Sequence, residues 1–192
     1  ETLIFGKAVQ RAEKPERLIV GSKTSKDLNK IKFLKILKKF SKNIINMDYK
    51  SAELTKISIN LFLISSINTT NMISHTCEKI GASWKSIVPA LKSDKRIGKY
   101  SYLEPSLSIG GTNLTRDVTA FHNLLPNEKN KHNKLLNVWN ENNLLHKKWA
   151  YNIIDNINKK KKIYRILIFG LSYKENTNSI KNSISLEIIK KY

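Results

Sequence analysis

The feature that most constrains the fold is a long helical pattern that starts near Asp48 and runs to about Gly81. Asp48 and Ser51 are both candidate N-cap residues, and Glu53 would lie in the first turn, where a negative charge favours a helix. Apolar residues at positions 54, 57, 61 and 64 continue one face. A glycine at position 81 is typical of the residue that follows a helix. The sequence therefore predicts one long helix over this region.

Three further helical patterns follow along the chain. The segment SWKSIVPALKS begins a short helix at residue 83, and its Pro89 is expected to end or to kink that helix. The segments 116–125 and 132–157 also carry apolar residues at helical spacing. The middle of the chain is therefore predicted to be nearly all helical.

Both ends of the chain contain short β-rich runs. ETLIF (1–5) and RLIVGS (17–22) are typical of strands, and a helical pattern at 25–40 follows them, which suits the closing edge of an α/β domain. Near the other end, the apolar run IYRILIFGLSY (163–173) predicts a parallel strand buried on both faces. SISLEIIKKY (183–192) predicts the helix that returns over that strand. We therefore expect a mixed α/β fold with a helical centre.

The ends of the printed sequence suggest that both α/β parts are incomplete. The chain begins at Glu1 without a methionine and stops at Tyr192 inside a helical pattern. We therefore expect a fragment of a longer protein, cut at both ends.

The net charge raises a separate class of function. The chain has 35 Lys+Arg and 15 Asp+Glu, and its formal net charge of +20 is typical of proteins that bind nucleic acid or acidic membranes. However, the lysines are spread along the whole chain, and no basic stripe with interleaved aromatic residues occurs. We interpret the charge as a solvated surface and keep nucleic-acid binding as a third hypothesis.

Cysteine, histidine and hydropathy patterns favour a cytoplasmic protein without a metal or a membrane. The single Cys77 has no partner for an internal disulfide, so a reducing compartment is the default. The four histidines, at positions 75, 122, 132 and 146, show no metal-ligand spacing, and we expect no metal site. No apolar run approaches the roughly 18 residues that a membrane helix needs.

Five stretches, in order along the chain, carry a resemblance to one enzyme family. They are ETLIFGKAV, KPERLIVGS, SAELTKISINLFL, RIGKYSYLEPSLSIGGTNLTRD and LIFGLSYKENTNSIKNSISLEII. Over essentially its whole length the chain resembles the UDP-glucose/GDP-mannose dehydrogenase family, the NAD-dependent nucleotide-sugar dehydrogenases. The resemblance implies the end of a Rossmann-like NAD-binding domain at 1–46. It further implies a central helical domain at 47–160, through which the protein forms a homodimer, and the start of a nucleotide-sugar-binding domain at 161–192.

The resemblance implies catalytic roles for two residues of the long helix. Lys56 and Asn60 are four residues apart, so their side chains project from one face of a helix. The family uses the matching lysine and asparagine to stabilise oxyanionic character at the carbon that is oxidised. A cation beside an amide donor suits that charge, and we expect both residues to act in this way.

The glycine turn resembles the part of the family that carries its nucleophile. The family pattern is Gly-Gly-Ser-Cys-x-x-Lys-Asp, and this chain has Gly110-Gly111-Thr112-Asn113-Leu114-Thr115-Arg116-Asp117. The family's cysteine attacks the intermediate aldehyde, but Asn113 stands at that position, and an amide cannot act as a covalent nucleophile. Asp117, one helical turn later, matches the family's catalytic aspartate. Arg116 is a candidate cofactor-binding residue.

A second departure from the family lies at the start of the chain. Glu1 matches the first glutamate of the family segment Pro-Glu-Phe-Leu-x-Glu-Gly, and Thr2 and Leu3 match substrate-binding positions. Phe5 stands where the family has its second glutamate, which helps the water of thioester hydrolysis. The departures at Asn113 and Phe5 both concern the covalent half of the reaction.

Further matches are to substrate-binding positions: Arg96, Tyr102, Leu103, Gly110, Gly111 and Lys174. In the family, the arginine that Arg96 matches reaches into the substrate site of the neighbouring subunit, and the lysine that Lys174 matches contacts the substrate. A guanidinium or ammonium group directed at a diphosphate is chemically apt. The two glycines would let the backbone approach a sugar or take a positive φ.

The sequence leaves two hypotheses within the family. The first is a NAD-dependent nucleotide-sugar 6-dehydrogenase homologue that oxidises a UDP- or GDP-sugar at C6 and serves polysaccharide precursor synthesis. The second is a non-catalytic nucleotide-sugar-binding homologue that lacks the thiol and has lost turnover. No G-x-G-x-x-G occurs in the chain, so the NAD site is expected mostly in an upstream domain, and the fragment alone is expected to be inactive.

Overall fold

The computed structural model describes residues 8–23, 33–110, 113–124, 131–162 and 165–192, and these form two compact units, Glu1–Ile59 and Asn60–Tyr192. Each unit is described by itself below. The expectations for residues 1–5 and for the first part of the 25–40 helix lie outside the described residues. The described chain is mixed α/β, as predicted, with mostly helical structure and one small parallel sheet.

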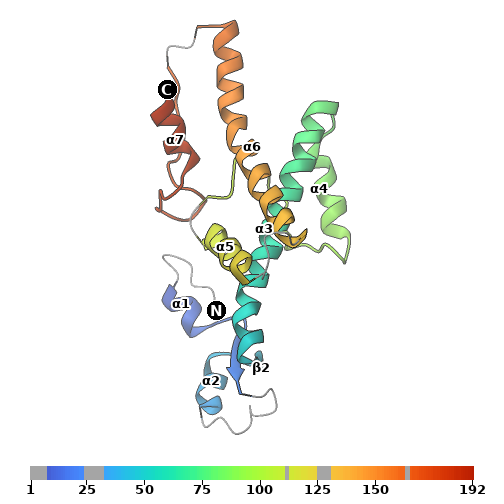
Figure 1. Cartoon of the computed structure of the whole chain (residues 1–192), viewed down its shortest axis with the longest axis vertical. Coiled ribbons are helices and arrows are strands. Elements are labelled where there is room, and N and C mark those ends of the chain that lie inside the picture. The colour runs from blue at the N-terminus through green and yellow to red at the C-terminus, as the bar shows by residue number, and fades with distance from the viewer. Residues whose placement is uncertain (1–7, 24–32, 111–112, 125–130, 163–164) are drawn as a thin grey trace. The chain divides into compact units, whose positions relative to one another are not determined.

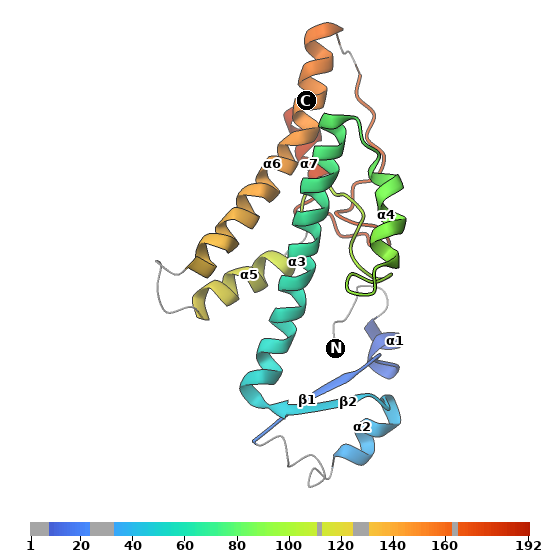
Figure 2. The same ribbon diagram turned by 90° about the vertical axis from the view of Figure 1, so that its right-hand side faces the viewer.

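The first unit is built around the parallel pair of strands β1 (Leu18–Ser22) and β2 (Ile44–Asp48). The helices α1 (Ala8–Glu13) and α2 (Leu34–Phe40) lie before and between them in the chain. Figure 2 shows the two strands side by side, and Leu18 pairs with Ile44 and Ser22 with Asp48, so all five residues of each strand are paired. The strand at 18–22 is confirmed, whereas β2 was not predicted from the sequence.

Helix α3 (Tyr49–Ile80) is the long helix that the sequence predicts. Its start is fixed by Asp48, whose Oδ1 accepts a hydrogen bond of 3.0 Å from the backbone N–H of Ser51. Its end is fixed by Gly81, at φ 76°, and by a 3.0 Å bond from the backbone N–H of Ala82 to the carbonyl of Cys77. Both ends therefore follow the capping chemistry expected from the sequence.

The second unit contains most of α3 together with α4 (Trp84–Ser93), α5 (Asn113–Leu124), α6 (Lys131–Lys160) and α7 (Ile184–Lys191). The three predicted helices of the central region are confirmed. Pro89 lies inside α4 but does not end it, because the helix continues to Ser93. Figure 1 shows α6 crossing α3, and the amide of Asn142 on α6 bonds to the side chain of Asn68 on α3 at 2.8 Å.

Two small apolar clusters form the core of the second unit. In the first, Cys77, Trp84 and Leu103 join α3, α4 and the loop that follows α4. In the second, Ala150, Ile184 and Ile188 join α6 and α7. The apolar clusters are small because much of the buried surface of α3 is polar: its buried residues are Asn60, Ile64, Asn68, Thr70, Asn71 and Cys77.

The apolar run predicted as a doubly buried strand differs from that expectation. Residues 165–170 have no strand partner among the described residues. The expected burial is also absent from two of its large apolar residues, because Leu167 is 78% exposed and Phe169 is 88% exposed. A buried parallel strand requires neighbouring strands as well as covering helices, and among the described residues this run packs only through Ile168, against α6 and α7. In the parts of the chain that are described, no helix has the length and apolarity to cross a membrane.

Candidate functional site

The strongest candidate site is a buried pair of polar side chains that joins α3 to α5. Asn60 Nδ2 donates a hydrogen bond of 2.5 Å to Asp117 Oδ2. Asn60 is 5% exposed and Asp117 3% exposed, so the pair is shielded from water on nearly all sides. The other carboxylate oxygen, Asp117 Oδ1, accepts from Arg116 Nε at 3.2 Å. A buried carboxylate held by an amide donor has a fixed orientation, which is what acid–base chemistry requires.

Lys56 lies one helical turn before Asn60 on the same helix. Lys56 is exposed to solvent, whereas Asn60 is buried. The compact-unit boundary falls between residues 59 and 60, so Lys56 belongs to the first unit and Asn60 to the second. The continuous helix is the element that carries both residues.

Asn113 is the first residue of α5 and is exposed. It precedes Asp117 by one helical turn, so the two side chains lie on the same face of α5. The N-terminus of a helix carries free N–H groups that favour negative charge. The position expected for a nucleophile is therefore accessible, but the side chain there is an amide.

The loop before α5 brings Gly110 against the C-terminal segment. A Cβ at position 110 would lie 2.9 Å from the Cβ of Tyr173 and 3.4 Å from the carbonyl oxygen of Asn182, so only glycine fits. Among the described residues, the glycines with a positive φ are 81, 98 and 170, so the conformation of Gly110 does not itself require glycine. The close approach is thus to the protein's own Tyr173. The ammonium group of the neighbouring Lys174 also lies near this tyrosine, with its Nζ 5.6 Å from the centre of the Tyr173 ring.

Tyr102 and Leu103 have opposite environments in this loop. Tyr102 is 51% exposed and is free to present its ring to a ligand. Leu103 is 8% exposed and packs in the core with Cys77 and Trp84, so its side chain supports the loop from inside. The burial of Cys77 in the same cluster leaves the only thiol of the chain without the solvent access that a reactive cysteine needs.

Arg96 is bound to Asp94 through its backbone N–H and through two hydrogen bonds of its guanidinium. Arg96 Nε lies 3.0 Å from Asp94 Oδ1, and its Nη2 lies 2.6 Å from Oδ2. These bonds lower the pKa of Asp94 and raise the pKa of Arg96. The guanidinium is 89% exposed and has to leave Asp94 before it can bind a phosphate.

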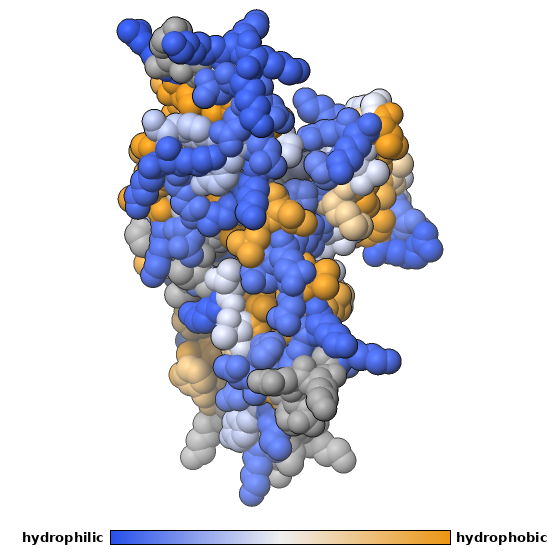
Figure 3. Space-filling view, turned by 45° about the horizontal axis from the view of Figure 1, so that its top comes forward, coloured by the Kyte–Doolittle hydropathy of each residue, from blue (hydrophilic) through white to orange (hydrophobic). Residues whose placement is uncertain are grey.

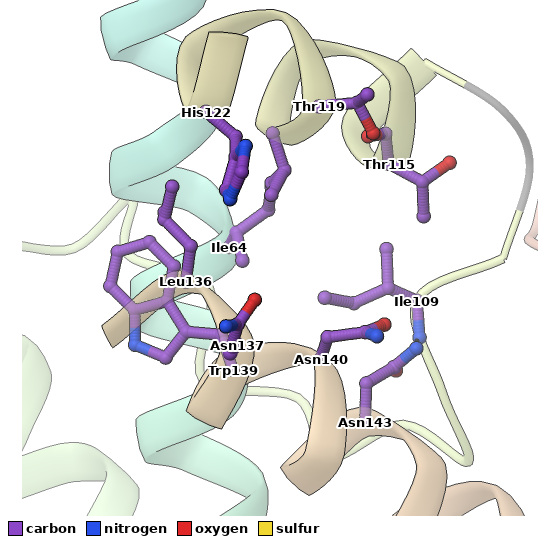
Figure 4. Close-up of a pocket in the computed structure, with 11 residues that line it drawn as sticks. Ile64, Ile109, Thr115, Thr119, His122, Leu136, Asn137, Trp139, Asn140 and Asn143 are labelled. Carbon is purple, nitrogen blue, oxygen red and sulfur yellow. Dashed lines mark hydrogen bonds between the residues drawn. The ribbon is translucent and has the colours of Figure 1, made fainter. Parts of the chain in front are cut away.

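A hollow of about 260 Å³ lies between α3, α5 and α6, but it is separate from the Asn60–Asp117 pair (Figure 4). Its lining on α5 comes from Thr115, Val118, Thr119 and His122. At 100° per residue these side chains lie on the side of α5 opposite to Asn113 and Asp117. Among the described residues, no group of three or more His, Cys, Asp or Glu side chains is placed to hold a metal ion.

Sequence reasoning missed several polar side chains on α3 and α6. Thr70, Asn71 and Asn143 bond to the loop before α5, whereas Asn142 on α6 bonds to Asn68 on α3. Asn60, Asn68 and Asn71 recur at helical spacing within an otherwise isoleucine-rich helix, and this spacing is the signal that would have indicated a buried polar face. The expected site residues Glu1, Thr2, Leu3 and Gly111, and the departure at Phe5, lie outside the described residues.

Comparison with known proteins gives the context of this geometry. Residues 50–144 match the model of the UDP-glucose/GDP-mannose dehydrogenase family, central domain. The chain is 30% identical over 191 residues to the UDP-glucose 6-dehydrogenase of Rickettsia prowazekii, covering 98% of this chain and 44% of that protein. It is 32% identical over 192 residues to the UDP-glucose 6-dehydrogenase of Campylobacter jejuni, covering 99% of this chain and 47% of that protein. The chain thus spans less than half the length of these relatives.

The fold is also that of solved proteins with the same architecture. A UDP-glucose dehydrogenase from the archaeon Pyrobaculum islandicum superposes with a TM-score of 0.78 at 22% identity, covering 100% of this chain and 43% of that chain. The family match includes α3, α4, α5 and the residues of the Asn60–Asp117 pair. By its motifs, its fold and its relatives, this chain belongs to the UDP-glucose/GDP-mannose dehydrogenase family.

Proposed function

We propose that the protein is an NAD-dependent nucleotide-sugar 6-dehydrogenase, of which this chain supplies the central part. The observation that carries the proposal is the buried Asn60–Asp117 pair, which joins the two helices that bear the family motifs. The names of the relatives, UDP-glucose 6-dehydrogenases, support oxidation of a nucleotide sugar at C6.

The residues of this chain suit the handling of a proton and of developing negative charge. Asp117 is a desolvated carboxylate that Asn60 holds in one orientation, so it can take and hold a proton near the reacting carbon. Lys56, one turn earlier on α3, supplies a cation that favours an oxyanion. Tyr102 and Lys174, both exposed, would bind the sugar and its diphosphate.

NAD is proposed as the oxidant on the basis of the family alone. The sequence has no G-x-G-x-x-G, and the β1–β2 pair is followed by α3 without a glycine-rich turn. The described residues therefore do not form a dinucleotide site. The exposed Arg116 is the candidate for a contact with it.

A second candidate function is binding of a nucleotide sugar without turnover. Asn113 at the nucleophile position favours it, because the second oxidation of the family passes through a covalent thioester. Cys77 cannot substitute, since it is buried in the apolar core. The first oxidation, from alcohol to aldehyde, needs no thiol and remains open to the protein.

One assay separates the two candidates. The complete protein that contains this chain is incubated with NAD and with UDP-glucose or GDP-mannose, and NADH is followed by absorbance. We expect NADH from one sugar, limited to the first oxidation, and a rate reduced about a hundredfold or more in Lys56→Ala. Sugar binding in calorimetry without NADH above the Lys56→Ala control would establish the non-catalytic function instead. The 192-residue chain alone is expected to form no NADH.

Homodimerisation and a cytoplasmic location are further proposals. Several large apolar side chains of the central helices are exposed in the single chain, including Phe62 at 77%, Val138 at 55% and Leu145 at 66%. Apolar side chains in this number on helices of one region suit an interface between subunits. Light scattering measures the molar mass of the complete protein and of its Leu145→Glu variant. We expect two subunits for the unaltered protein and one for the variant, and a mass of one subunit for the unaltered protein would contradict the dimer.

A further inference from the structure

The backbone of residues 102–109 is held by side chains of three helices. Thr70 Oγ1 on α3 donates to the carbonyl of Tyr102 at 2.7 Å, and Trp84 Nε1 on α4 donates to the carbonyl of Leu103 at 3.0 Å. These two bonds fix the first part of the loop.

The second part of the loop is fixed by two asparagine side chains. The backbone N–H of Ser106 donates to Asn71 Oδ1 at 2.8 Å, and that of Ile109 donates to Asn143 Oδ1 at 2.6 Å. We call Thr70, Asn71, Trp84 and Asn143 the loop anchors. The loop has no regular secondary structure, so side chains take the place of the backbone partners that a helix or strand would supply.

Two of the loop anchors, Thr70 and Asn71, are buried polar residues. Thr70 is 2% exposed and Asn71 3% exposed, and both lie in the middle of α3. A threonine or asparagine inside a helix is unfavourable by propensity, and burial of its polar groups is tolerated only when they are hydrogen-bonded. Their polar groups form hydrogen bonds with the loop, and these bonds explain why polar side chains are buried at these positions of α3.

The same helix holds both parts of the candidate site. Asn71 lies about three helical turns after Asn60 on α3, on nearly the same face. Asn60 binds Asp117 on α5, while Asn71 binds the loop that leads into Gly110 and α5. Helix α3 therefore holds both the Asp117 carboxylate and the loop at Ser106.

We propose that Asn71, supported by Asn143, is a positioning residue that orders the loop for nucleotide-sugar binding. This inference rests on the proposed function of the site. Without the anchors, Tyr102 and Gly110 would sample several positions, and the sugar would have to order the loop when it binds. Loss of an anchor thus weakens binding of the nucleotide sugar, while Asn60 and Asp117 stay in place.

The first test measures the loop itself. Asn71→Leu has a similar volume and removes both polar groups, and Asn142→Ala is the matched control, because it removes an asparagine bond between α6 and α3 that does not contact the loop. By hydrogen exchange of the complete protein, we expect amide exchange in residues 102–110 to rise about tenfold in Asn71→Leu and to be unchanged in Asn142→Ala. Equal exchange in both variants would overturn the anchoring.

The second test measures the nucleotide sugar. We expect the KM for UDP-glucose or GDP-mannose, or the Kd where there is no turnover, to rise about tenfold in Asn71→Leu, with kcat reduced by less than about threefold. A merely structural role would lower the folded fraction, which reduces the apparent kcat and leaves KM unchanged. That pattern, or a KM equal to that of Asn142→Ala, would overturn the inference.

A third pair of variants covers the case in which Asn71→Leu does not fold. Asn143 is only half-buried, so Asn143→Ala removes the bond to Ile109 with little change to the core, and Asn143→Asp retains an acceptor oxygen. We expect a raised KM in Asn143→Ala and recovery in Asn143→Asp. Failure of the proposed function is seen differently, as no sugar binding by the unaltered protein. Failure of this inference is seen as sugar binding that no anchor variant changes.

Discussion

At the scale of residues, Asn60 and Asp117 illustrate how a sequence can bury polar groups at a reactive position. Each satisfies the other, and Arg116 pairs with the remaining carboxylate oxygen. The Arg116 side chain is 65% exposed, so this ion pair contributes little to stability. The Asn60–Asp117 bond matters more, because loss of one partner leaves a buried polar group without its bond.

A pair of substitutions at position 117 separates the stability of this bond from its chemistry. Asp117→Leu leaves Asn60 Nδ2 without its acceptor and should lower the free energy of unfolding by roughly 1–3 kcal/mol. Asp117→Asn keeps an acceptor oxygen and the shape, so it should change stability by less than about 1 kcal/mol, yet it should reduce NADH formation about a hundredfold. Urea denaturation and the NADH assay measure the two effects. Equal destabilisation by both variants would contradict the role of the hydrogen bond.

Restoring a thiol at position 113 tests the place of the missing nucleophile. Asn113→Cys would lie on the face of α5 that carries Asp117, near the helix N-terminus, which favours a thiolate. In the complete protein with NAD and nucleotide sugar, we expect the aldehyde to be trapped and then oxidised to a thioester. The resemblance aligns Phe5 with the glutamate that helps hydrolysis in the family, and on that basis we expect this adduct to accumulate.

Mass spectrometry locates that adduct. A mass increase on residue 113 supports the proposed geometry of the glycine turn. Intact sugar binding without any adduct would show that residue 113 does not face the reacting carbon, and would favour the non-catalytic function.

At the scale of elements, the contact between α3 and α6 is made largely by polar and aromatic side chains. His75 and His146 meet edge to face with ring centres 6.0 Å apart. Trp149 Nε1 donates to Glu78 Oε2 at 3.1 Å, and His75 Nδ1 lies 3.8 Å from the same oxygen. This end of the helix pair thus contains His146, whose pKa is shifted.

The pH dependence of this contact has a definite sign. Burial lowers the pKa of His146, His75 acts in the same direction and Glu78 opposes it. Between the ordinary histidine pKa of about 6.5 and the lowered value, the unfolded chain binds the proton more tightly than the folded chain. The stabilisation is therefore complete above about pH 6.5 and is lost as the pH falls below it.

Replacement of His146 by Gln tests this dependence. We expect the unaltered protein to lose thermal stability between about pH 7.5 and 5, and His146→Gln to lose less. The carboxylates with lowered pKa values, Asp48, Asp94 and Asp155, lose their stabilisation only at more acidic pH. His122→Gln, on α5, is the control and should retain the full loss. If the melting temperatures of the unaltered protein and of His146→Gln fall equally with pH, His146 is not the group responsible.

At the scale of the whole molecule, the net charge of +20 is distributed and not concentrated in one site. The face in Figure 3 shows hydrophilic side chains over most of its area, with apolar side chains in separate patches between them. A charge spread in this way attracts polyanions without selecting among them.

The binding of nucleic acid is therefore expected to be generic. Fluorescence anisotropy with a labelled DNA duplex should show weak binding at about 50 mM salt that is lost near 200 mM. Two duplexes of different sequence should behave alike. Binding that persists at 200 mM salt and prefers one sequence would revive the third hypothesis.

The amino-acid sequence was sufficient to predict the central helices, the two ends of α3 and the family. Local chemistry is sufficient for these: Asp48 and Gly81 mark the ends of α3, and the motifs around Asn60 and Asp117 occur in the printed order. Which distant groups meet became visible in the folded chain alone. The parallel pairing of β2, the burial of Leu103, the closeness of Gly110 to Tyr173 and the bonds of Asn71 to Ser106 each join residues far apart in the chain. Helical spacing shows which residues share a face but not what that face packs against, and so buried asparagines resembled surface residues until their partners were placed.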